Sequence, residues 1–432
     1  MTRIAVIGAG ITGVSTVSSL LDRGYDVTLF DRNRYPAMQT SFANGGQLSA
    51  SNAETWNRWS TVFKGIKWLT TKGAPLLVNP KPSWHKYSWM AEFLRAIPRY
   101  KANTTETARL AILSRELLKE KAARFGIDFD CEQRGILHIY TDRDEFEHAG
   151  AVNKLLTGAG LDRRAVTPEE MRAIEPALSG EFEGGYYTES DFTGDIHRYT
   201  CGLADACRDA GADLRFEADI RQVHWHDDGV IIDWARGEQA EHERFDGVVV
   251  CAGVESRKLA GALGDRVNVY PVKGYSITVD LDDAASQAAA PWVSLLDDEA
   301  KVVTSRLGAK RFRIAGTAEF NGTNLDIRAD RITPLVRWCE RFFPGVRTEQ
   351  VTPWAGLRPM MPDMMPRVGA GKRPGVFYNT GHGHLGWTLS AVTAELLADA
   401  VAQQMPAIGA RAGGSVADAS WPARDVADLA HS

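Results

Sequence analysis

Cysteine is scarce in this sequence, with five residues in a chain of 432. The number is odd, the positions lie far apart, and no spacing resembles a zinc-ligand set or a disulfide framework. This scarcity excludes a disulfide-stapled scaffold and gives no indication of a metal site. It also favours a reducing compartment, so we expect a cytoplasmic protein without a bound metal. The five positions are Cys131, Cys201, Cys207, Cys251 and Cys339.

The sequence also lacks a long apolar run and an excess of positive charge. No stretch of about 18 consecutive apolar residues is apparent, which argues against a membrane-spanning helix. The amino end, MTRIAVIGAG, has a short apolar run broken by glycines and followed by no cleavage site, so we expect a buried strand and not a signal peptide. The formal net charge of −5 gives no indication of nucleic-acid binding.

Glycine, by contrast, is plentiful, with 40 residues, and glycine-rich segments lie near both ends of the chain. A chain of 432 residues is too long for a single hydrophobic core. We therefore expect two closely joined domains.

The first 31 residues predict a strand, a glycine turn, a helix and a second strand. Gly8, Gly10 and Gly13 form G-x-G-x-x-G after the apolar run Ile4–Ile7, and Asp31 ends the second strand. Gly8 permits a tight turn, Gly10 lets a pyrophosphate reach the backbone, and Gly13 allows close packing of helix on strand. The helix terminus then faces the phosphates, and Asp31 can accept hydrogen bonds from a ribose. The pattern predicts a dinucleotide, either NAD or FAD.

The segment QTSFANGGQLSA (39–50) follows the second strand and is rich in small residues. Such residues suit a loop that lies against a large flat ligand, and Ser41 and Asn44 can exchange hydrogen bonds with it. A surface loop without a ligand is the alternative interpretation.

The segment RFDGVVVCAGVES (244–256) predicts another buried strand. It ends in the small residues Cys251–Gly253, which would let the strand tip approach a cofactor. We expect a β-meander before it, with a turn at Asp227–Gly229. Within this meander, Ile220 and Val223 either contact an adenine ring or belong to the core.

The segment YNTGHGHLGWTLSAVTAELL (378–397) contains three glycines and two histidines directly before an apolar helix. Leu389 and Val392 recur at helical spacing, which predicts a helix that begins near Trp387 or Thr388. Amides at such a terminus stabilise the negative charge of a reduced flavin ring. We therefore expect this bare turn to contact a flavin, which favours FAD over NAD.

Together these blocks resemble the FAD-dependent D-amino acid oxidase superfamily, and within it the bacterial D-amino acid dehydrogenases of the small-subunit type. The resemblance extends over roughly residues 1 to 403. Its carboxyl-terminal motif is more specific than the glycine fingerprint. The matching stretches include VIGAGITGVSTVSSLLDRGYDVTLFDR, TSFANGGQ, VVVCAGVES, YPVKGYSITV, GLRPMMPDMMPRVG and NTGHGHLGWTLS.

The resemblance implies an α/β (α+β) fold, with a Rossmann-type FAD-binding domain and a second, substrate domain built on a mixed or antiparallel sheet. We expect an FAD-binding domain of residues 1–55, 150–260 and 350–405, a substrate domain of residues 56–149 and 261–349, and a carboxyl-terminal tail at 406–432. The predicted FAD contacts are Gly8, Ala9, Gly10, Ile11, Thr12, Gly13, Asp31, Arg32, Thr40, Ser41, Asn44, Gly45, Gly46, Gln47, Leu48, Ile220, Cys251, Ala252, Gly253, Gly381, His382, Gly383, Leu385, Gly386, Trp387 and Thr388.

The implied reaction is oxidation of a small amino acid, most favourably of D configuration, by hydride transfer to flavin N5. Water then converts the imino acid to a 2-oxo acid and ammonia. A secondary amine, such as a hydroxyproline isomer or N-methylglycine, is an alternative substrate. A non-catalytic FAD-binding subunit and an NAD-dependent dehydrogenase are alternatives of other classes. Relatives pass their electrons to a membrane quinone, so a quinone or another respiratory-chain acceptor is the expected partner beside the amino acid.

The resemblance also suggests which side chains meet the substrate. Arg358 is the predicted carboxylate clamp, because a guanidinium binds a carboxylate with two parallel hydrogen bonds. Tyr275 is expected to bond the same carboxylate, Lys273 to lie near flavin N5, and His382 to lie beside the ring. Arg313 is a weaker candidate for the carboxylate.

The segment 56–101 has an unusual composition. It contains five of the 12 tryptophans and nine lysines and arginines against one acid, Glu92. An aromatic and basic surface suits contact with a membrane, and would place the protein peripherally on the inner face. A lid over the active site, or a helical pair packed in the core, is the alternative.

Overall fold

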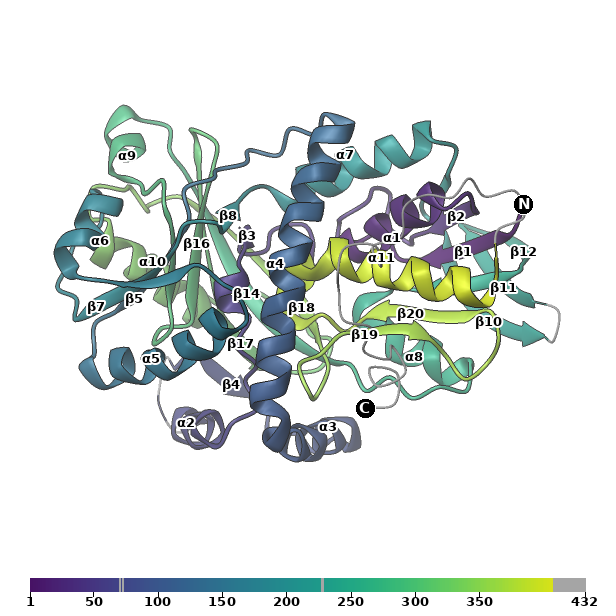
Figure 1. The fold of residues 1–432 in the computed structure, drawn as a ribbon, viewed down its shortest axis with the longest axis horizontal. Helices are drawn as coiled ribbons and strands as arrows, with labels where there is room; N and C mark the ends of the chain where they lie inside the picture. The colour runs from purple at the N-terminus through teal and green to yellow at the C-terminus, as the bar shows by residue number, and fades with distance from the viewer. Residues whose placement is uncertain (70, 72–73, 227–228, 407–432) are drawn as a thin grey trace.

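The computed structural model describes residues 1–69, 71, 74–226 and 229–406. Figure 1 shows two lobes, with the amino-terminal strand and the carboxyl-terminal helix together in one of them. The tail predicted at 406–432 lies, beyond its first residue, outside the described residues. So do the two aspartates of the turn predicted at Asp227–Gly229.

One lobe is built on a six-stranded, mostly parallel sheet. In spatial order its strands are β19 (Arg367–Ala370), β20 (Val376–Thr380), β13 (Gly247–Val250), β1 (Arg3–Ile7), β2 (Asp26–Phe30) and β9 (Asp213–Arg215). All neighbours run parallel except β19, which is antiparallel to β20. The strands β1, β2 and β13 are those that the sequence predicts, in the arrangement of a Rossmann-type sheet.

Different layers cover the two faces of this sheet. Ile4 and Val6 of β1 share a core with the helices on one face, and Ala5 and Ile7 share a core with the layer on the other. Because both faces are covered, β1 is a continuous apolar run. The helices of the first face are α1 (Ile11–Asp22), α7 (Ile196–Asp209) and α11 (Gly386–Gln404). The second layer is α8 (Ser256–Ala262) and the predicted meander, β10 (Asp219–His226), β11 (Gly229–Arg236) and β12 (Gln239–Phe245).

The other lobe is built on a nine-stranded mixed sheet. In spatial order its strands are β18 (Val351–Met360), β14 (Tyr270–Asp280), β17 (Arg311–Phe320), β16 (Val302–Leu307), β15 (Ser294–Asp297), β5 (Ile136–Tyr140), β7 (Gly184–Thr188) and β6 (Arg163–Val166), with β4 (Leu76–Val78) paired to β17. The pairs are antiparallel except β15–β5 and β17–β4. Helix α10 (Ala329–Phe342) packs on this sheet. The predicted fold class is confirmed.

Sheet membership differs from the expected division of the chain at two places. β6 and β7 belong to the nine-stranded sheet, although residues 150–260 are expected in the FAD-binding domain. β18 also belongs to it, although residues 350–405 are expected there too. An apolar run identifies a strand but not the neighbour with which it pairs, so sequence pattern alone does not assign these strands.

Helix α4 (Tyr100–Phe125) joins the two lobes. Its Leu110 shares an apolar cluster with Leu156 of α5 (Arg143–Gly158) and with Leu389 of α11. α5 packs on β5 and β6 of the nine-stranded sheet, whereas α11 covers the six-stranded one. Figure 1 shows α4 crossing the molecule between the lobes.

The tryptophan-rich segment forms two helices around β4, namely α2 (Trp59–Leu69) and α3 (Trp84–Arg95), which lie along the lower edge in Figure 1. The remaining named elements are short. They are β3 (Gln47–Leu48), β8 (Phe192–Thr193), α6 (Pro168–Ile174), α9 (Ala284–Ala289) and the single 3-10 turns η1 (Ala50–Asn52), η2 (Ile97–Arg99), η3 (Gly253–Glu255) and η4 (Gly383–Leu385).

One segment has the length and apolar composition that a membrane crossing requires, in contrast to the expectation from sequence. It comprises η4 and α11, Gly383–Gln404. However, 67% of its most apolar window is buried inside the fold. It therefore has the properties of a core helix.

A buried ion pair between Asp191 and Arg115 connects the η1 turn, which follows β3, with α4. The Asp191 carboxylate is fully buried and accepts a hydrogen bond from Arg115 Nη1 at 2.8 Å. It also accepts the backbone N–H groups of Ala50 and Ser51, each at 3.0 Å. Removing one member of such a group leaves the others buried without partners, which typically costs about 3–5 kcal/mol.

We predict that Asp191→Ala lowers the free energy of unfolding by about 3–5 kcal/mol, because Arg115 and two amides lose their acceptor. Urea unfolding followed by circular dichroism measures this as a lower midpoint. The control is Asp205→Ala, which removes an exposed helical ion pair with Arg208 and should change stability by less than about 1 kcal/mol. Equal midpoints for the two variants would show that the buried network contributes nothing.

Candidate active site

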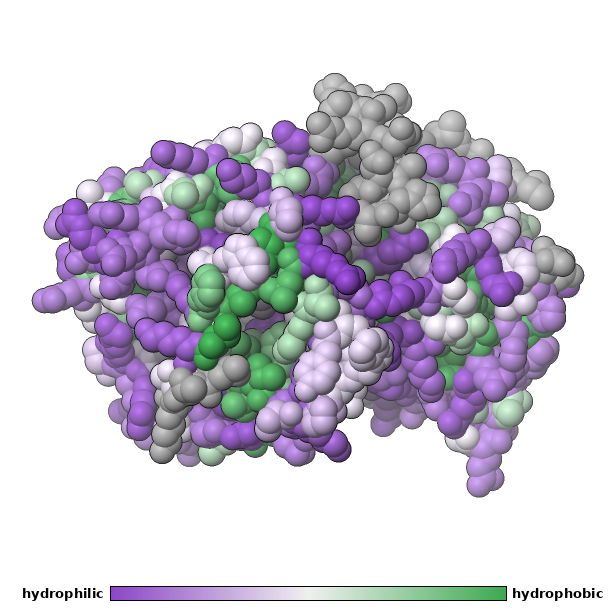
Figure 2. All heavy atoms as spheres, turned by 90° about the horizontal axis from the view of Figure 1, so that it is seen from below, coloured by the Kyte–Doolittle hydropathy of each residue, from purple (hydrophilic) through white to green (hydrophobic). Residues whose placement is uncertain are grey.

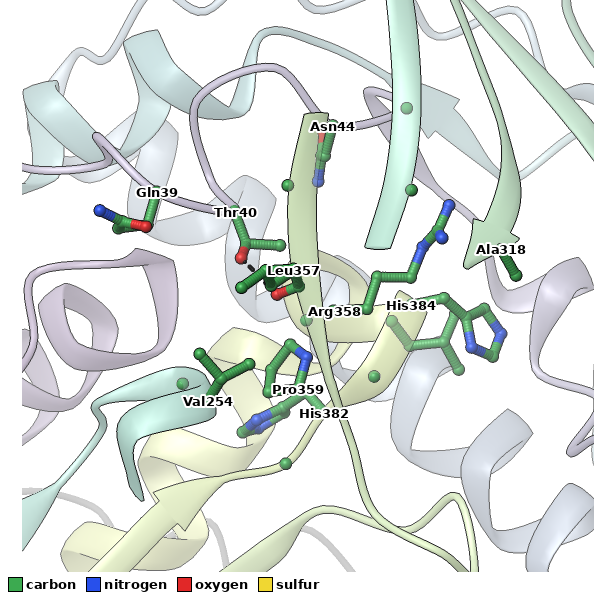
Figure 3. A pocket seen from close by; sticks show the side chains of 18 of the residues that line it. Gln39, Thr40, Asn44, Val254, Ala318, Leu357, Arg358, Pro359, His382 and His384 are labelled. Carbon is green, nitrogen blue, oxygen red and sulfur yellow. Dashed lines mark hydrogen bonds between the residues drawn. The ribbon is translucent and has the colours of Figure 1, made fainter. Parts of the chain in front are cut away.

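A cavity of about 760 Å³ lies between the two sheets, a volume typical of small-molecule sites. One wall comes from the turn after β1, residues 39–49, the tip of β13 and the turn before α11. The opposite wall comes from β14, β16, β17 and β18. Figure 3 shows residues of both walls from close by.

Glycines close the turn after β1. Gly8 has a φ of +109°, and a Cβ there would lie 2.6 Å from the Cys251 carbonyl oxygen, while a Cβ on Gly13 would overlap the Gly8 carbonyl. Gly10 differs, because a Cβ on it would meet only Ser41 Oγ, at 3.5 Å. Gly10 is also the N-cap of α1 and borders the cavity, so the positive end of this helix faces open space suited to a phosphate.

The cavity brings together most of the predicted cofactor residues. Ala9, Gly13 and Leu48 are the exceptions. Ala9 and Leu48 are fully buried in the core, and alternation along β3 explains the second case, since Gln47 borders the cavity and Leu48 points the other way. Those that line it are Gly8, Gly10, Ile11, Thr12, Asp31, Arg32, Thr40, Ser41, Asn44, Gly45, Gly46, Gln47, Ile220, Cys251, Ala252, Gly253, Gly381, His382, Gly383, Leu385, Gly386, Trp387 and Thr388.

Asp31 borders the cavity at the end of β2, yet its carboxylate already holds the glycine turn. It accepts the backbone N–H of Ala9 at 2.7 Å, and the backbone and side-chain N–H groups of Asn33 at 2.7 and 2.8 Å. Its contact with a ribose stays a prediction.

The turn before α11 needs its glycines for reasons that differ from the one expected. Gly381 and Gly383 have φ angles of +81° and +59°, and a Cβ on either would overlap or crowd the side chains of Met361 and Met360. The packing of the fold itself therefore requires glycine at both positions, independently of any ligand. Gly386 is different, since a Cβ there would meet only His382 Cβ at 3.7 Å. Close approach of a ligand to the backbone of this residue stays a prediction.

Of the two histidines of the turn, His382 is buried and His384 is half-buried, and both are neutral. Burial lowers the pKa of His382 to about 3, and its Nε2 lies 3.0 Å from Thr393 Oγ1. Burial likewise lowers the pKa of His384 to about 4; its ring stacks on Trp56, and its Nε2 lies 3.3 Å from the Asn52 carbonyl oxygen. His382 therefore has a structural partner and carries no charge at neutral pH.

Arg358 projects from β18 into the cavity. Its Nη1 donates to the Thr317 carbonyl oxygen at 2.9 Å, and its guanidinium lies where a Cβ on Gly274 would be. Burial lowers the pKa of Arg358 to about 10, so it stays charged at neutral pH. Within the part of the chain that the structure describes, no carboxylate pairs with it. The sequence gives no signal for the contact of Arg358 with Thr317. Gly274, a glycine inside strand β14, is a usable signal that another group lies close to this strand.

The other predicted substrate residues have partners within the protein, which corrects their expected contacts, although Tyr275 does border the cavity. Lys273 does not line the cavity and pairs with buried Glu319 at 3.2 Å. The Tyr275 hydroxyl donates to the same Glu319 at 2.6 Å. An irregular pairing of β14 with β17 between these residues disturbs the alternation and directs both side chains to Glu319. Arg313 also lies off the cavity, and its Nε donates to Thr278 Oγ1 at 2.8 Å.

The tryptophan-rich segment forms part of the cavity wall. Trp56, Ile66 and Trp68 border the cavity from the α2 region, and Trp89 and Phe93 border it from α3. This arrangement agrees with a lid over the active site. The same helices face outward on their other side.

Four buried polar atoms of the cavity wall have no partner in the protein, and so fit a bound ligand. They are Gln47 Oε1, Thr317 Oγ1, His384 Nδ1 and Trp387 Nε1. Buried polar atoms are rarely left unpaired, so a polar ligand is the expected partner. Together with the terminus of α1, these residues suit FAD, which would supply an acceptor for hydride.

Comparison with known proteins supports this interpretation. A protein family described as FAD dependent oxidoreductase (DAO) matches residues 3–400. The chain is 62% identical over 406 residues to D-amino acid dehydrogenase 3 of Mesorhizobium japonicum, covering 94% of this chain and 98% of that protein. It is 39% identical over 413 residues to D-amino acid dehydrogenase of Dechloromonas aromatica, covering 94% and 98%.

Solved structures share the fold. The crystal structure of glycine oxidase from Geobacillus kaustophilus superimposes with a TM-score of 0.74 at 21% sequence identity, covering 94% of this chain and 97% of that one. The family match covers nearly the whole described chain, and its glycine turn, carboxyl-terminal turn and cavity occupy the matched residues. The chain therefore belongs to the DAO family of FAD dependent oxidoreductases.

Proposed function

We propose that this enzyme oxidises D-amino acids to imino acids, which water converts to 2-oxo acids and ammonia. The observation that carries the proposal is the guanidinium of Arg358, charged and without a carboxylate partner among the described residues, in a cavity that fits FAD. The names of the relatives, D-amino acid dehydrogenases at 62% and 39% identity, support the D configuration.

An unpaired buried cation is costly unless a ligand completes it. A substrate carboxylate matches the planar fork of Arg358 and would orient the Cα–H bond. The bound FAD supplies the hydride acceptor. Since His382 and His384 are neutral and already hydrogen-bonded, the chain contributes orientation here and no charged base from this turn.

Anaerobic mixing of the purified flavoprotein with single substrates tests this function. D-amino acids should bleach the flavin absorbance, while the L-enantiomers should not. Bleaching by hydroxyproline isomers or N-methylglycine alone would identify a secondary-amine dehydrogenase instead. A flavoprotein that no amine reduces would identify a non-catalytic subunit, and a colourless protein that acts with NAD would refute a flavoenzyme.

We predict that Arg358→Ala lowers kcat/KM for D-amino acids at least about 30-fold, since removing one member of a buried charged pair costs about 2–5 kcal/mol. Arg358→Lys should recover only part of this loss, because an ammonium cannot bind both carboxylate oxygens in parallel. FAD content, read from the absorbance ratio, should stay constant.

Tyr275→Phe is the matched control for this experiment. Tyr275 borders the cavity, but its hydroxyl donates to Glu319, so loss of that hydroxyl should change KM little. A large rise in KM for Tyr275→Phe, together with normal kinetics for Arg358→Ala, would show that Tyr275 and not Arg358 binds the substrate carboxylate.

We further propose that the electrons pass to a membrane quinone, with α2 and α3 resting on the inner face of the membrane and the remainder facing the cytoplasm. Trp59, Phe63 and Ile66 of α2 lie on one side of the helix and are 56%, 65% and 59% exposed. Trp84 of α3 is 82% exposed. Figure 2 views this face and shows hydrophobic residues gathered at its centre.

The charge of this segment supports contact with anionic lipid. Nine lysines and arginines lie in residues 56–101 against one acid. Basic residues beside an inserted aromatic face attract the negative surface of a lipid bilayer. Because α2 and α3 also line the cavity, an acceptor dissolved in the membrane would approach the active site through them.

We predict that Trp59→Ser and Phe63→Ser together weaken binding to anionic liposomes at least about tenfold, because two apolar side chains outside the cavity wall lose their burial in lipid. Co-sedimentation measures this. Turnover with liposome-borne quinone should fall, while turnover with a soluble dye should not. The control is Leu325→Ser with Ile327→Ser, which removes two exposed apolar residues elsewhere. Equal lipid binding by both variants would refute this surface.

A further inference from the structure

A chain of hydrogen bonds leaves the main cavity beside Ser49, which borders it. The Ser49 hydroxyl lies 3.0 Å from the Ser51 hydroxyl, and Ser51 Oγ lies 3.0 Å from His138 Nε2. His138 Nδ1 lies 3.3 Å from the Asp298 carboxylate. Ser49 and His138 are each 2% exposed, whereas the Asp298 side chain is 30% exposed. This chain of hydrogen bonds therefore connects the buried cavity wall at Ser49 with solvent at Asp298.

The outer half of this chain has a fixed direction. Burial, with repulsion from Arg163, lowers the pKa of His138 to about 4, so its ring carries a single N–H at neutral pH. Burial would raise the pKa of Asp298, but the Lys301 ammonium and the His138 contact hold it well below its usual range. A carboxylate only accepts, so His138 Nδ1–H donates to Asp298 and Nε2 is left as an acceptor.

The inner half follows from the outer half. Because His138 Nε2 accepts, the Ser51 hydroxyl is the group that donates to it in this relay, in competition with the Asp191 carboxylate, which already accepts the Ser51 backbone N–H at 3.0 Å. Ser51 Oγ is then free to accept from Ser49. Ser49 Oγ already accepts the backbone N–H of Asn52 at 3.1 Å, which is consistent with donation of its hydroxyl hydrogen to Ser51. Every donor thus points from the cavity towards Asp298.

A second cavity of about 40 Å³ lies where the chain emerges, and is large enough for a water molecule. Ser51, His138, Asp298 and Lys301 all border it. Asp298 and Lys301 also border the main cavity. The hydrogen-bonded chain therefore joins the buried part of the cavity wall at Ser49 with its partly exposed part at Asp298. Tyr140 donates to the Asp298 carboxylate at 2.7 Å from outside the chain.

We propose that Ser49, Ser51, His138 and Asp298 form a relay that carries the amine proton of the substrate out of the main cavity. The proposal rests on the proposed oxidation of amino acids. A zwitterionic substrate must lose one N–H proton and one hydride from Cα to become an iminium, and the oxidant FAD takes the hydride. The proton must therefore reach water by another path.

Each step of the relay breaks one bond to hydrogen and forms another. The substrate N–H proton moves to Ser49 Oγ, and the Ser49 proton moves to Ser51. The Ser51 proton then moves to His138 Nε2, and the Nδ1 proton of His138 moves to Asp298, from which bulk water takes it. No net charge accumulates on the relay, because one proton enters as one leaves. Each pass leaves His138 as the Nε2–H tautomer, so proton exchange with water must restore the Nδ1–H tautomer before the next turnover.

Cutting the relay at Ser51 tests the proposal. Ser51→Ala should slow anaerobic flavin reduction by a D-amino acid at least about 100-fold, the lower end of the range for loss of positioned proton transfer, with little change in KM. Ser51→Thr keeps a hydroxyl and should restore the rate. Tyr140→Phe removes a hydrogen bond to the same carboxylate outside the path, and should leave the rate unchanged.

A second variant separates proton transfer from packing. His138→Ala should be slow, and added imidazole should restore its rate of flavin reduction. 1-Methylimidazole has a similar shape but no N–H to donate to Asp298, so it should not. Rescue by both compounds, or a wild-type rate in Ser51→Ala, would overturn the relay.

The histidine tautomer gives a test that needs no turnover. Nitrogen-15 chemical shifts should show His138 of the FAD-loaded protein as the Nδ1–H tautomer at neutral pH, and the Nε2–H tautomer would overturn the relay. These outcomes differ from failure of the proposed function. In that case the wild-type flavin would not be reduced by any D-amino acid, whatever the state of His138.

Discussion

The charge of Arg358, half-buried and without a carboxylate partner among the residues that the structure describes, is the constraint around which the cavity is arranged. The surrounding strands accommodate it in two ways. Gly274 leaves room for the guanidinium, and Thr317, whose φ is +59°, turns its carbonyl towards it. A β-branched residue in this region of φ and ψ is strained, and such strain persists where the surroundings impose it at a functional site.

The two ends of the polypeptide must meet for this cavity to exist. Arg23 at the end of α1 bonds Glu395 and Asp399 of α11, at 2.9 and 2.5 Å, so the first and last long helices of the described chain are joined directly. Lys121 of α4 adds a contact to Glu395 at 3.1 Å. The helix terminus at Gly10 and the turn before α11 consequently border the same space.

The sequence predicts the features whose signal is local. The glycine turn, the strands on either side of it, the apolar carboxyl-terminal helix and Arg358 all lie where their patterns place them. Lys273 and Tyr275 do not, because one irregular strand pairing directs both towards Glu319, and no pattern in the sequence marks that irregularity. Contacts such as Ser51 with His138 join residues distant in the chain, so only the fold reveals them.

Helix α4 makes the two lobes mechanically dependent on each other. Leu110 and its neighbours form a single apolar cluster with α5 on one side and α11 on the other. Opening the lobes like a hinge would expose that cluster to water, at a cost that rises with the apolar area uncovered. The two sheets should therefore melt as one cooperative unit.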